Sequence, residues 1–214
     1  MIRRLLAALA LAAPAFLPFA APAQQTVPFI EINPPLPTDA TGGRVEVVEF
    51  FWYECPHCYS LEPRIEAWLK NLPKDVEFRR VPAMFNQQWA HSGRVYYTLE
   101  AIGELGRLHR PLFDAIHNGG LKITNMKQLQ GWLEREKVDV AKFNAAFNSF
   151  AVESRMKRAL ELTATSKIDS VPQMMVNGRY LVSADSAKGD MLLVVNALIE
   201  HARKPVASAA PKKK

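Results

Sequence analysis

The run RVEVVEFFWYE (residues 44–54) constrains the fold more than any other part of the chain. It is β-branched, aromatic and mostly apolar, which predicts a central strand buried on both faces. From residue 56 the apolar residues recur at three- and four-residue steps, which is the period of a helix, and Pro63 is expected to kink that helix. A second strand is predicted at VEFRRVP (76–82). A strand, a helix and a strand in this order predict a parallel βαβ unit with a right-handed crossover.

The next segment has a different character. Residues 84–165 are rich in Ala, Leu, Glu, Lys and Gln with amphipathic spacing, so we expect several helices and no strand there. The resulting fold class is α/β, with an all-helical domain (84–165) inserted between two halves of one sheet domain, at 24–83 and 166–203. The first half also contains a short strand candidate at 27–32.

The sheet returns at SVPQMMVNGRYLVS (170–183). Asn177 and Gly178 separate two apolar runs, and this dipeptide strongly predicts a β-hairpin because both residues tolerate positive φ. A last amphipathic helix is expected from residue 186 to residue 201, with Asp185 or Ser186 as its N-cap.

Both ends of the chain differ from the rest. Residues 1–23 combine Arg3 and Arg4 with an apolar stretch and small residues near Ala23, which is typical of a cleaved secretory signal peptide. Residues 204–214 are rich in Ala, Pro and Lys, and we expect a disordered basic tail. The formal net charge of +6 is modest for 214 residues, and it gives no reason to expect a nucleic-acid partner.

Cys55 and Cys58 are the chain's two cysteines, and they are three positions apart. In an oxidising compartment such a pair is expected to form a disulfide. The chain is long enough to build a core without this bond, and closing so small a loop removes little entropy from the unfolded chain. We therefore interpret the pair as a reactive dithiol.

The junction between a strand and a helix gives Cys55 a special environment. Unpaired N–H groups and the helix dipole stabilise an anion there, so the pKa of Cys55 should be depressed, with protonated His57 adding to the effect. Glu54 opposes it, and we expect the helix terminus and His57 to prevail if Glu54 points to solvent. Cys58, one turn inside the helix, should be the buried resolving thiol. A stabilised thiolate favours the reduced protein, so the disulfide is predicted to be a strong oxidant.

Other uses of a Cys-x-x-Cys pair fit less well. A structural zinc site needs a second pair of ligands, and covalent haem attachment needs a histidine where Tyr59 stands. The remaining histidines, at 91, 109, 117 and 201, show no metal-ligand spacing and suit surface or core-edge positions. We expect neither a metal nor a cofactor.

Glu49 and Pro172 also stand out. Glu49 interrupts the apolar strand, so it is either a buried acid that exchanges protons with the dithiol or a rim carboxylate paired with a base such as Arg80. Pro172 opens a strand, where the residues alone favour a trans peptide bond because cis bonds are rare. A cis Val171–Pro172 bond would instead present its backbone to an extended substrate.

Three stretches together carry a resemblance to a known family: FFWYECPHCYSLEP, the long helical insertion and SVPQMMVNGRYLV. They resemble the DsbA family of periplasmic thiol:disulfide interchange proteins, dithiol oxidases with a thioredoxin fold. The likeness runs from about residue 46 to residue 199. Tyr53 and Glu54 are more polar than expected of that family, and the Ala/Lys tail has no counterpart in it.

The resemblance implies that Cys55 is the nucleophile, Cys58 the resolving thiol and Glu49 the buried acid, with Pro56 and His57 as the residues between the cysteines. It implies a cis Pro172 beside the dithiol, unfolded exported proteins as substrates, and a DsbB-type membrane quinone reductase as reoxidant. We expect a monomer. The alternatives are a disulfide isomerase or reductase of the same fold, and a peptide-binding chaperone whose disulfide is incidental.

Overall fold

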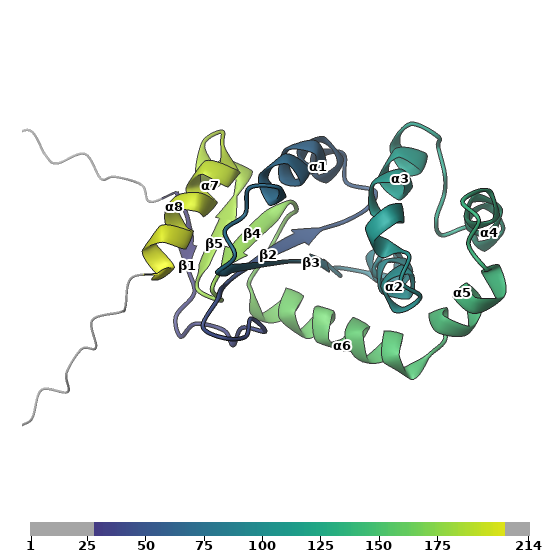
Figure 1. Cartoon of the computed structure of the whole chain (residues 1–214), viewed down its shortest axis with the longest axis horizontal. Coiled ribbons are helices and arrows are strands. Elements are labelled where there is room, and N and C mark those ends of the chain that lie inside the picture. The colour runs from purple at the N-terminus through teal and green to yellow at the C-terminus, as the bar shows by residue number, and fades with distance from the viewer. Residues whose placement is uncertain (1–27, 204–214) are drawn as a thin grey trace, which may run out of the picture.

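The computed structural model describes residues 28–203, and the predicted signal peptide and basic tail lie outside the described residues. The fold is a five-stranded sheet with helices on its faces and a group of helices at one end (Figure 1). The strands are β1 (Ile30–Glu31), β2 (Val45–Phe51), β3 (Val76–Pro82), β4 (Gln173–Val176) and β5 (Tyr180–Ser183). The helices are α1 (Pro56–Leu69), α2 (Gln87–Ala101), α3 (Leu105–His117), α4 (Met126–Arg135), α5 (Val140–Phe147), α6 (Phe150–Thr165), α7 (Ala184–Ala187) and α8 (Met191–Arg203).

The strand order is β1-β5-β4-β2-β3, so β2 is interior. It pairs in parallel with β3 and antiparallel with β4, and all seven of its residues are buried. The predicted parallel unit and the predicted buried strand are therefore confirmed. Of the predicted strand at 27–32, residue 27 lies outside the described residues, and within 28–32 the strand is limited to the two residues of β1, which pair with β5.

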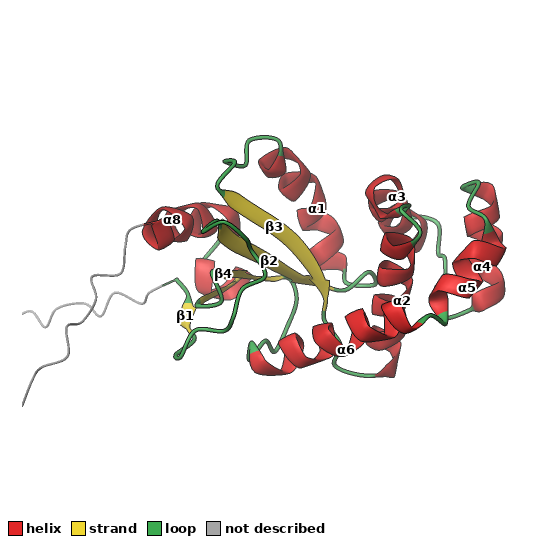
Figure 2. Cartoon of the chain, turned by 60° about the horizontal axis from the view of Figure 1, so that its bottom comes forward, coloured by secondary structure: helices red, strands yellow, loops and turns green. Residues whose placement is uncertain are grey.

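Five helices, α2 to α6, follow β3 in the chain and precede β4. Figure 1 shows most of them beside the sheet, with α6 running from α5 back toward the sheet, and Figure 2 shows α1 against one face of the strands. Phe51 and Tyr53, at the end of β2, pack against rings from α2 and α3: Tyr96, His109 and Phe113. The helical group and the sheet thus share one hydrophobic core next to the Cys-x-x-Cys segment.

The C-terminal part departs from the prediction in one place. The Asn177–Gly178 hairpin is confirmed, with φ of 52° and 65° at its two residues. The single helix predicted from residue 186 is instead two, α7 and α8, because Lys188 (φ 47°) and Gly189 (φ 133°) adopt left-handed conformations that end a helix. The predicted N-cap was also wrong. Ser183 caps α7, and the Asp190 side chain accepts from the first N–H groups of α8.

Among the described residues no helix has both the length and the apolar character needed to cross a membrane.

Candidate active site

Cys55 caps the N-terminus of α1, immediately after the central strand. Its backbone is extended, and its Sγ accepts a hydrogen bond from the N–H of Cys58 at 3.4 Å. Pro56 takes the first helical position, where its missing N–H costs nothing. Both cysteines are free thiols in this structure, which therefore has the geometry of the reduced protein. Cys55 is 7% exposed and Cys58 is fully buried, so the predicted burial of Cys58 is confirmed.

The pKa of Cys55 is lowered from its ordinary value to about 6. The largest cause is the Cys58 thiol, which donates a hydrogen bond to the Cys55 sulfur. Burial works in the opposite direction, and the backbone N–H groups of Cys58 and His57 and the His57 charge lower the pKa further. The predicted direction is confirmed. Reasoning from the helix terminus alone missed the main contributor, which is the partner cysteine.

Glu54 does not point freely to solvent, so the condition attached to the Cys55 prediction is not met, although the pKa of Cys55 is lowered all the same. Glu54 is half-buried, Gln88 Nε2 donates to its Oε1 at 3.4 Å, and burial raises the pKa of this carboxyl. The pKa of Cys58 is raised well above its ordinary value, first by burial and then by its neighbour Cys55, with Glu49 contributing. One cysteine is thus set to be an anion and the other a neutral thiol.

The Val171–Pro172 segment lies against Cys55. The Cys55 thiol donates to the Val171 carbonyl oxygen at 3.5 Å, across 116 positions of sequence. The Val171–Pro172 bond is cis, so the trans bond favoured by the residues alone was wrong and the bond implied by the resemblance is present. His57, Val171 and Pro172 line one side of a pocket of about 430 Å³ that Arg64 and Met191 complete.

Glu49 belongs to a buried cluster of charges below the dithiol. It is 1% exposed and faces Arg80 across the β2–β3 pair, with Oε2 at 3.1 Å from Arg80 Nε. Arg80 Nη2 donates to Glu62 of α1, and His109 Nε2 of α3 lies 3.5 Å from the same carboxylate.

The two carboxyls of this cluster are not equivalent. Burial raises the pKa of Glu49 to about 8, although Arg80 lowers it and Glu62 raises it further. Burial also works to raise the pKa of Glu62, but contact with His109 and the Arg80 charge lower it below its ordinary value. Burial lowers the pKa of His109. At neutral pH Glu62 is therefore a carboxylate, Arg80 is a guanidinium cation and Glu49 is a protonated carboxyl.

Comparisons with known proteins decide the family. Residues 46–192 match the model of the DSBA-like thioredoxin domain, which is more than half of the chain. The chain belongs to this family. It is 42% identical over 204 residues to the thiol:disulfide interchange protein DsbA of Bordetella parapertussis, which covers 94% of this chain and 97% of that one. It is 42% identical over 177 residues to DsbA of Azotobacter vinelandii, which covers 82% of each chain. The crystal structure of Pseudomonas aeruginosa DsbA superposes with a TM-score of 0.78 at 38% identity, covering 82% of this chain and 92% of that one.

Membership of the DsbA family fixes the fold class and the activity class. The fold is a thioredoxin fold with a helical insertion, and the chain is a thiol:disulfide oxidoreductase. No group of three or more His, Cys, Asp or Glu side chains within residues 28–203 is arranged to hold a metal ion.

The structure brings most of the predicted site residues to one place. Cys55, Pro56, His57 and Cys58 form the first turn of α1, and Val171 touches Cys55. Glu49 is buried rather than at a rim, and it also lies beside Arg80, the base expected for the rim alternative; its exchange of protons with the dithiol stays a prediction.

Sequence reasoning missed Glu62, His109 and Tyr53. The Tyr53 hydroxyl lies 2.9 Å from His109 Nδ1, and His109 is buried rather than at a surface or core edge. Its only sequence signal is its place on the apolar face of α3, between Leu108 and Leu112, which are both buried. Glu62 likewise lies beside buried Leu61.

Proposed function

We propose that this protein donates its Cys55–Cys58 disulfide to newly exported, unfolded proteins. The observation that carries the proposal is the pKa of Cys55, lowered to about 6 beside a Cys58 whose pKa is raised. At neutral pH the low pKa of Cys55 stabilises the reduced protein, and it makes the Cys55 thiolate a good leaving group. Each unit of pKa below the ambient pH makes a two-electron couple about 30 mV more oxidising.

The proposed reaction has two exchange steps. A substrate thiolate attacks Cys55 Sγ, the Cys55–Cys58 bond breaks, and Cys58 leaves as a thiolate that takes up a proton. A second substrate thiolate then attacks the substrate sulfur of the mixed disulfide and expels the Cys55 thiolate. The substrate loses two electrons in forming its disulfide, and the protein gains them as the Cys55 thiolate and the Cys58 thiol.

Five further residues have proposed roles. Glu49, protonated below about pH 8, supplies the proton for Cys58 and accepts it on the way back. His57 and Pro56 shape the first turn of α1, where His57 provides an N–H and a charge for the Cys55 thiolate. Val171 and Pro172 offer backbone to an extended substrate beside Cys55.

Membership of the family supports a proposal for the cellular setting and the domain organisation. We propose that residues 1–23 direct the chain to the periplasm, that cleavage occurs near Ala23 and that the mature chain works as a monomer. A membrane quinone reductase of the DsbB type would reoxidise Cys55 and Cys58. Residues 24–83 and 166–203 would form the thioredoxin-like domain, and 84–165 the inserted helical domain.

The redox potential of the Cys55–Cys58 couple tests the proposal. Equilibration with glutathione buffers should give a potential far above about −270 mV, the value of a cytosolic reductant such as thioredoxin. A value near that of thioredoxin would reject the oxidase. Cys58→Ser, with Cys55 first activated as a mixed disulfide with thionitrobenzoate, should react with the thiol of a reduced unfolded protein, release thionitrobenzoate and accumulate the protein–substrate mixed disulfide, because no resolving thiol is left. Cys55→Ser should lose turnover, which a peptide-binding chaperone would not.

A further inference from the structure

A groove of about 750 Å³ lies between α2 and α6, on the helical part of the molecule. The structure exposes five large hydrophobic side chains among residues 28–203, and three of them line this groove: Phe85 (42% exposed), Phe150 (86%) and Leu160 (52%). Exposed apolar side chains scattered singly are ordinary, but a gathered set marks an interaction surface. We call this feature the α2–α6 groove.

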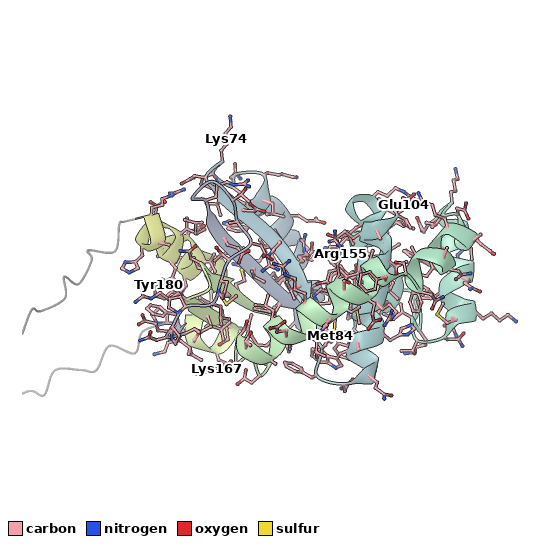
Figure 3. All side chains as sticks on the ribbon, turned by 90° about the horizontal axis from the view of Figure 1, so that it is seen from below. Lys74, Met84, Glu104, Arg155, Lys167 and Tyr180 are labelled. Carbon is pink, nitrogen blue, oxygen red and sulfur yellow. The ribbon has the colours of Figure 1, made fainter. Side chains whose placement is uncertain are left out.

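The floor of the groove is adaptable. Met84 and Met156 line it, and both are 6% exposed. Figure 3 views this side of the molecule and labels Met84 beside α6. Gly93 of α2 makes room for them, since a Cβ there would lie 2.8 Å from Met84 Cε and 3.7 Å from Met156 Sδ. Methionine side chains repack around varied partners, so such a floor accepts side chains of different shapes.

The groove is continuous with the redox site. Phe85 packs on Trp89 with ring centroids 4.8 Å apart, and Trp89 stacks on Trp52 at 4.3 Å. The Trp52 carbonyl accepts from the N–H of Cys55 at 3.1 Å. The segments that carry Trp52 and Phe85 follow β2 and β3, which are parallel, so they leave the sheet at the same edge. A row of three rings therefore leads from Cys55 to the groove.

The charged side chains that line the groove are of both signs, so the groove does not favour a ligand of one charge. Arg94 pairs with Glu153 at 2.6 Å, and Lys157 and Glu161 also line the groove. Recognition there must come from the apolar walls. An extended chain advances about 3.3 Å per residue, so a few residues of a polypeptide held at Cys55 suffice to follow the ring row.

We propose that the α2–α6 groove binds the unfolded polypeptide substrate itself, by taking a large apolar side chain from the segment next to the reacting cysteine. This inference rests on the proposed function and deepens it, because it gives the oxidase a preference for chains with exposed apolar residues. The groove is separate from the pocket beside Val171 and Pro172, since the residues that line the two sites differ.

The test compares two single-cysteine peptides of equal length, one with Phe about five residues from the cysteine and one with Ser in its place. The rate constant for their attack on the oxidised protein is measured by stopped-flow, with dithiothreitol as a reagent too small to reach the groove. Wild-type protein should react about five- to ten-fold faster with the Phe peptide, since burying a phenylalanine is worth at least this factor. Phe85→Ser/Phe150→Ser should lose that preference. The matched control is Leu193→Ser, which is 68% exposed on α8 and distant from the groove lining, and it should keep the preference.

The contrary outcomes distinguish a failure of the groove proposal from a failure of the proposed function. Equal rates for the two peptides with wild-type protein, or an unchanged preference in Phe85→Ser/Phe150→Ser, would overturn the groove proposal while leaving the oxidase standing. If sedimentation showed a wild-type dimer that Phe85→Ser/Phe150→Ser converts to monomer, the groove would be a self-association surface instead. If neither the peptides nor dithiothreitol reduced the disulfide at a useful rate, the proposed function would fail, and the groove proposal with it.

Discussion

Arg80 and Glu49 face each other in the protein interior, in register on paired strands and 3.1 Å apart. The same guanidinium also binds Glu62 of α1, so one cation serves two carboxyls that are each 1% exposed. Arg80, on β3, therefore connects the central sheet to α1 through its contacts with Glu49 of β2 and Glu62 of α1.

Replacing Arg80 with Leu should destabilise the protein strongly. The buried Glu62 carboxylate would lose its counter-ion, and breaking a buried pair in this way costs about 3–5 kcal/mol in free energy of unfolding. Denaturant unfolding at neutral pH measures the loss, which should shrink in acid because protonated carboxyls need no counter-ion. Arg64→Leu is the control, since Arg64 pairs with Asp190 at the surface, where both side chains are 50% exposed, and it should cost less than about 1 kcal/mol. Equal losses for the two variants would mean that Arg80 is not a buried counter-ion.

Glu49→Gln should slow the attack of Cys58 on a mixed disulfide at Cys55. Cys58 must lose a proton for this attack, and Glu49 accepts it once ionised, above its pKa of about 8. The release of glutathione from a preformed Cys55–glutathione mixed disulfide reports this step without any external thiol. Its rate in wild-type protein should rise with an inflection near pH 8. The Gln variant should lack the inflection and react at least about ten-fold more slowly.

Glu66→Gln provides the matched control, since Glu66 is exposed on α1. It should keep both the rate and the inflection. A Glu49→Gln profile that superposes on that of the wild-type protein would remove Glu49 from the proton path.

The sequence predicted those features that depend on local pattern. The buried strand β2, its parallel partner β3 and the 177–178 hairpin follow from hydrophobic periodicity and turn chemistry, and the reactive dithiol follows from its place at a helix start. The final helix was predicted as continuous because the left-handed residues Lys188 and Gly189 carry no strong signal in an otherwise amphipathic run.

The buried charge cluster could not be predicted in the same way. Glu62 and His109 are 47 positions apart on different helices, and only the packing of α1 against α3 brings them together. A charged residue on an amphipathic helix is ordinarily solvated, so their burial depends on tertiary structure. The Cys58 hydrogen bond to Cys55 depends on side-chain orientation, which a spacing of three residues permits but does not specify.

Cys58→Ala should raise the pKa of Cys55 by about one to two units, because a hydrogen bond to a charged group is worth about 1.5–3 kcal/mol. Titration of the thiolate by ultraviolet absorbance measures the change. Cys58→Ser should give a smaller rise, since a hydroxyl still donates. Ser60→Ala, which removes only a bond to the Pro56 carbonyl, should leave the pKa unaltered. If Cys58→Ala titrated like wild-type protein, the helix terminus alone would account for the Cys55 thiolate.

The reduced protein should gain stability over the oxidised protein as pH rises from 5 to 8. The pKa of Cys55 is about 6 when folded and about 8.5 in an unfolded chain. A group with a depressed pKa contributes stability that is complete above the unfolded value and is lost as pH falls through the folded value. At pH 7 this amounts to about 1 kcal/mol, after allowance for solvent screening, and it should vanish near pH 5. The oxidised protein lacks the contribution because its Cys55 does not titrate. The disulfide's effect on the unfolded chain is independent of pH. Cys58, whose pKa is raised by the fold, opposes the trend only near its unfolded pKa of about 8.5, so the pH slope of the difference between the two melting curves from pH 5 to pH 8 isolates the Cys55 thiolate. A difference that stayed flat from pH 5 to pH 8 would show that the Cys55 thiolate is not stabilised by the fold.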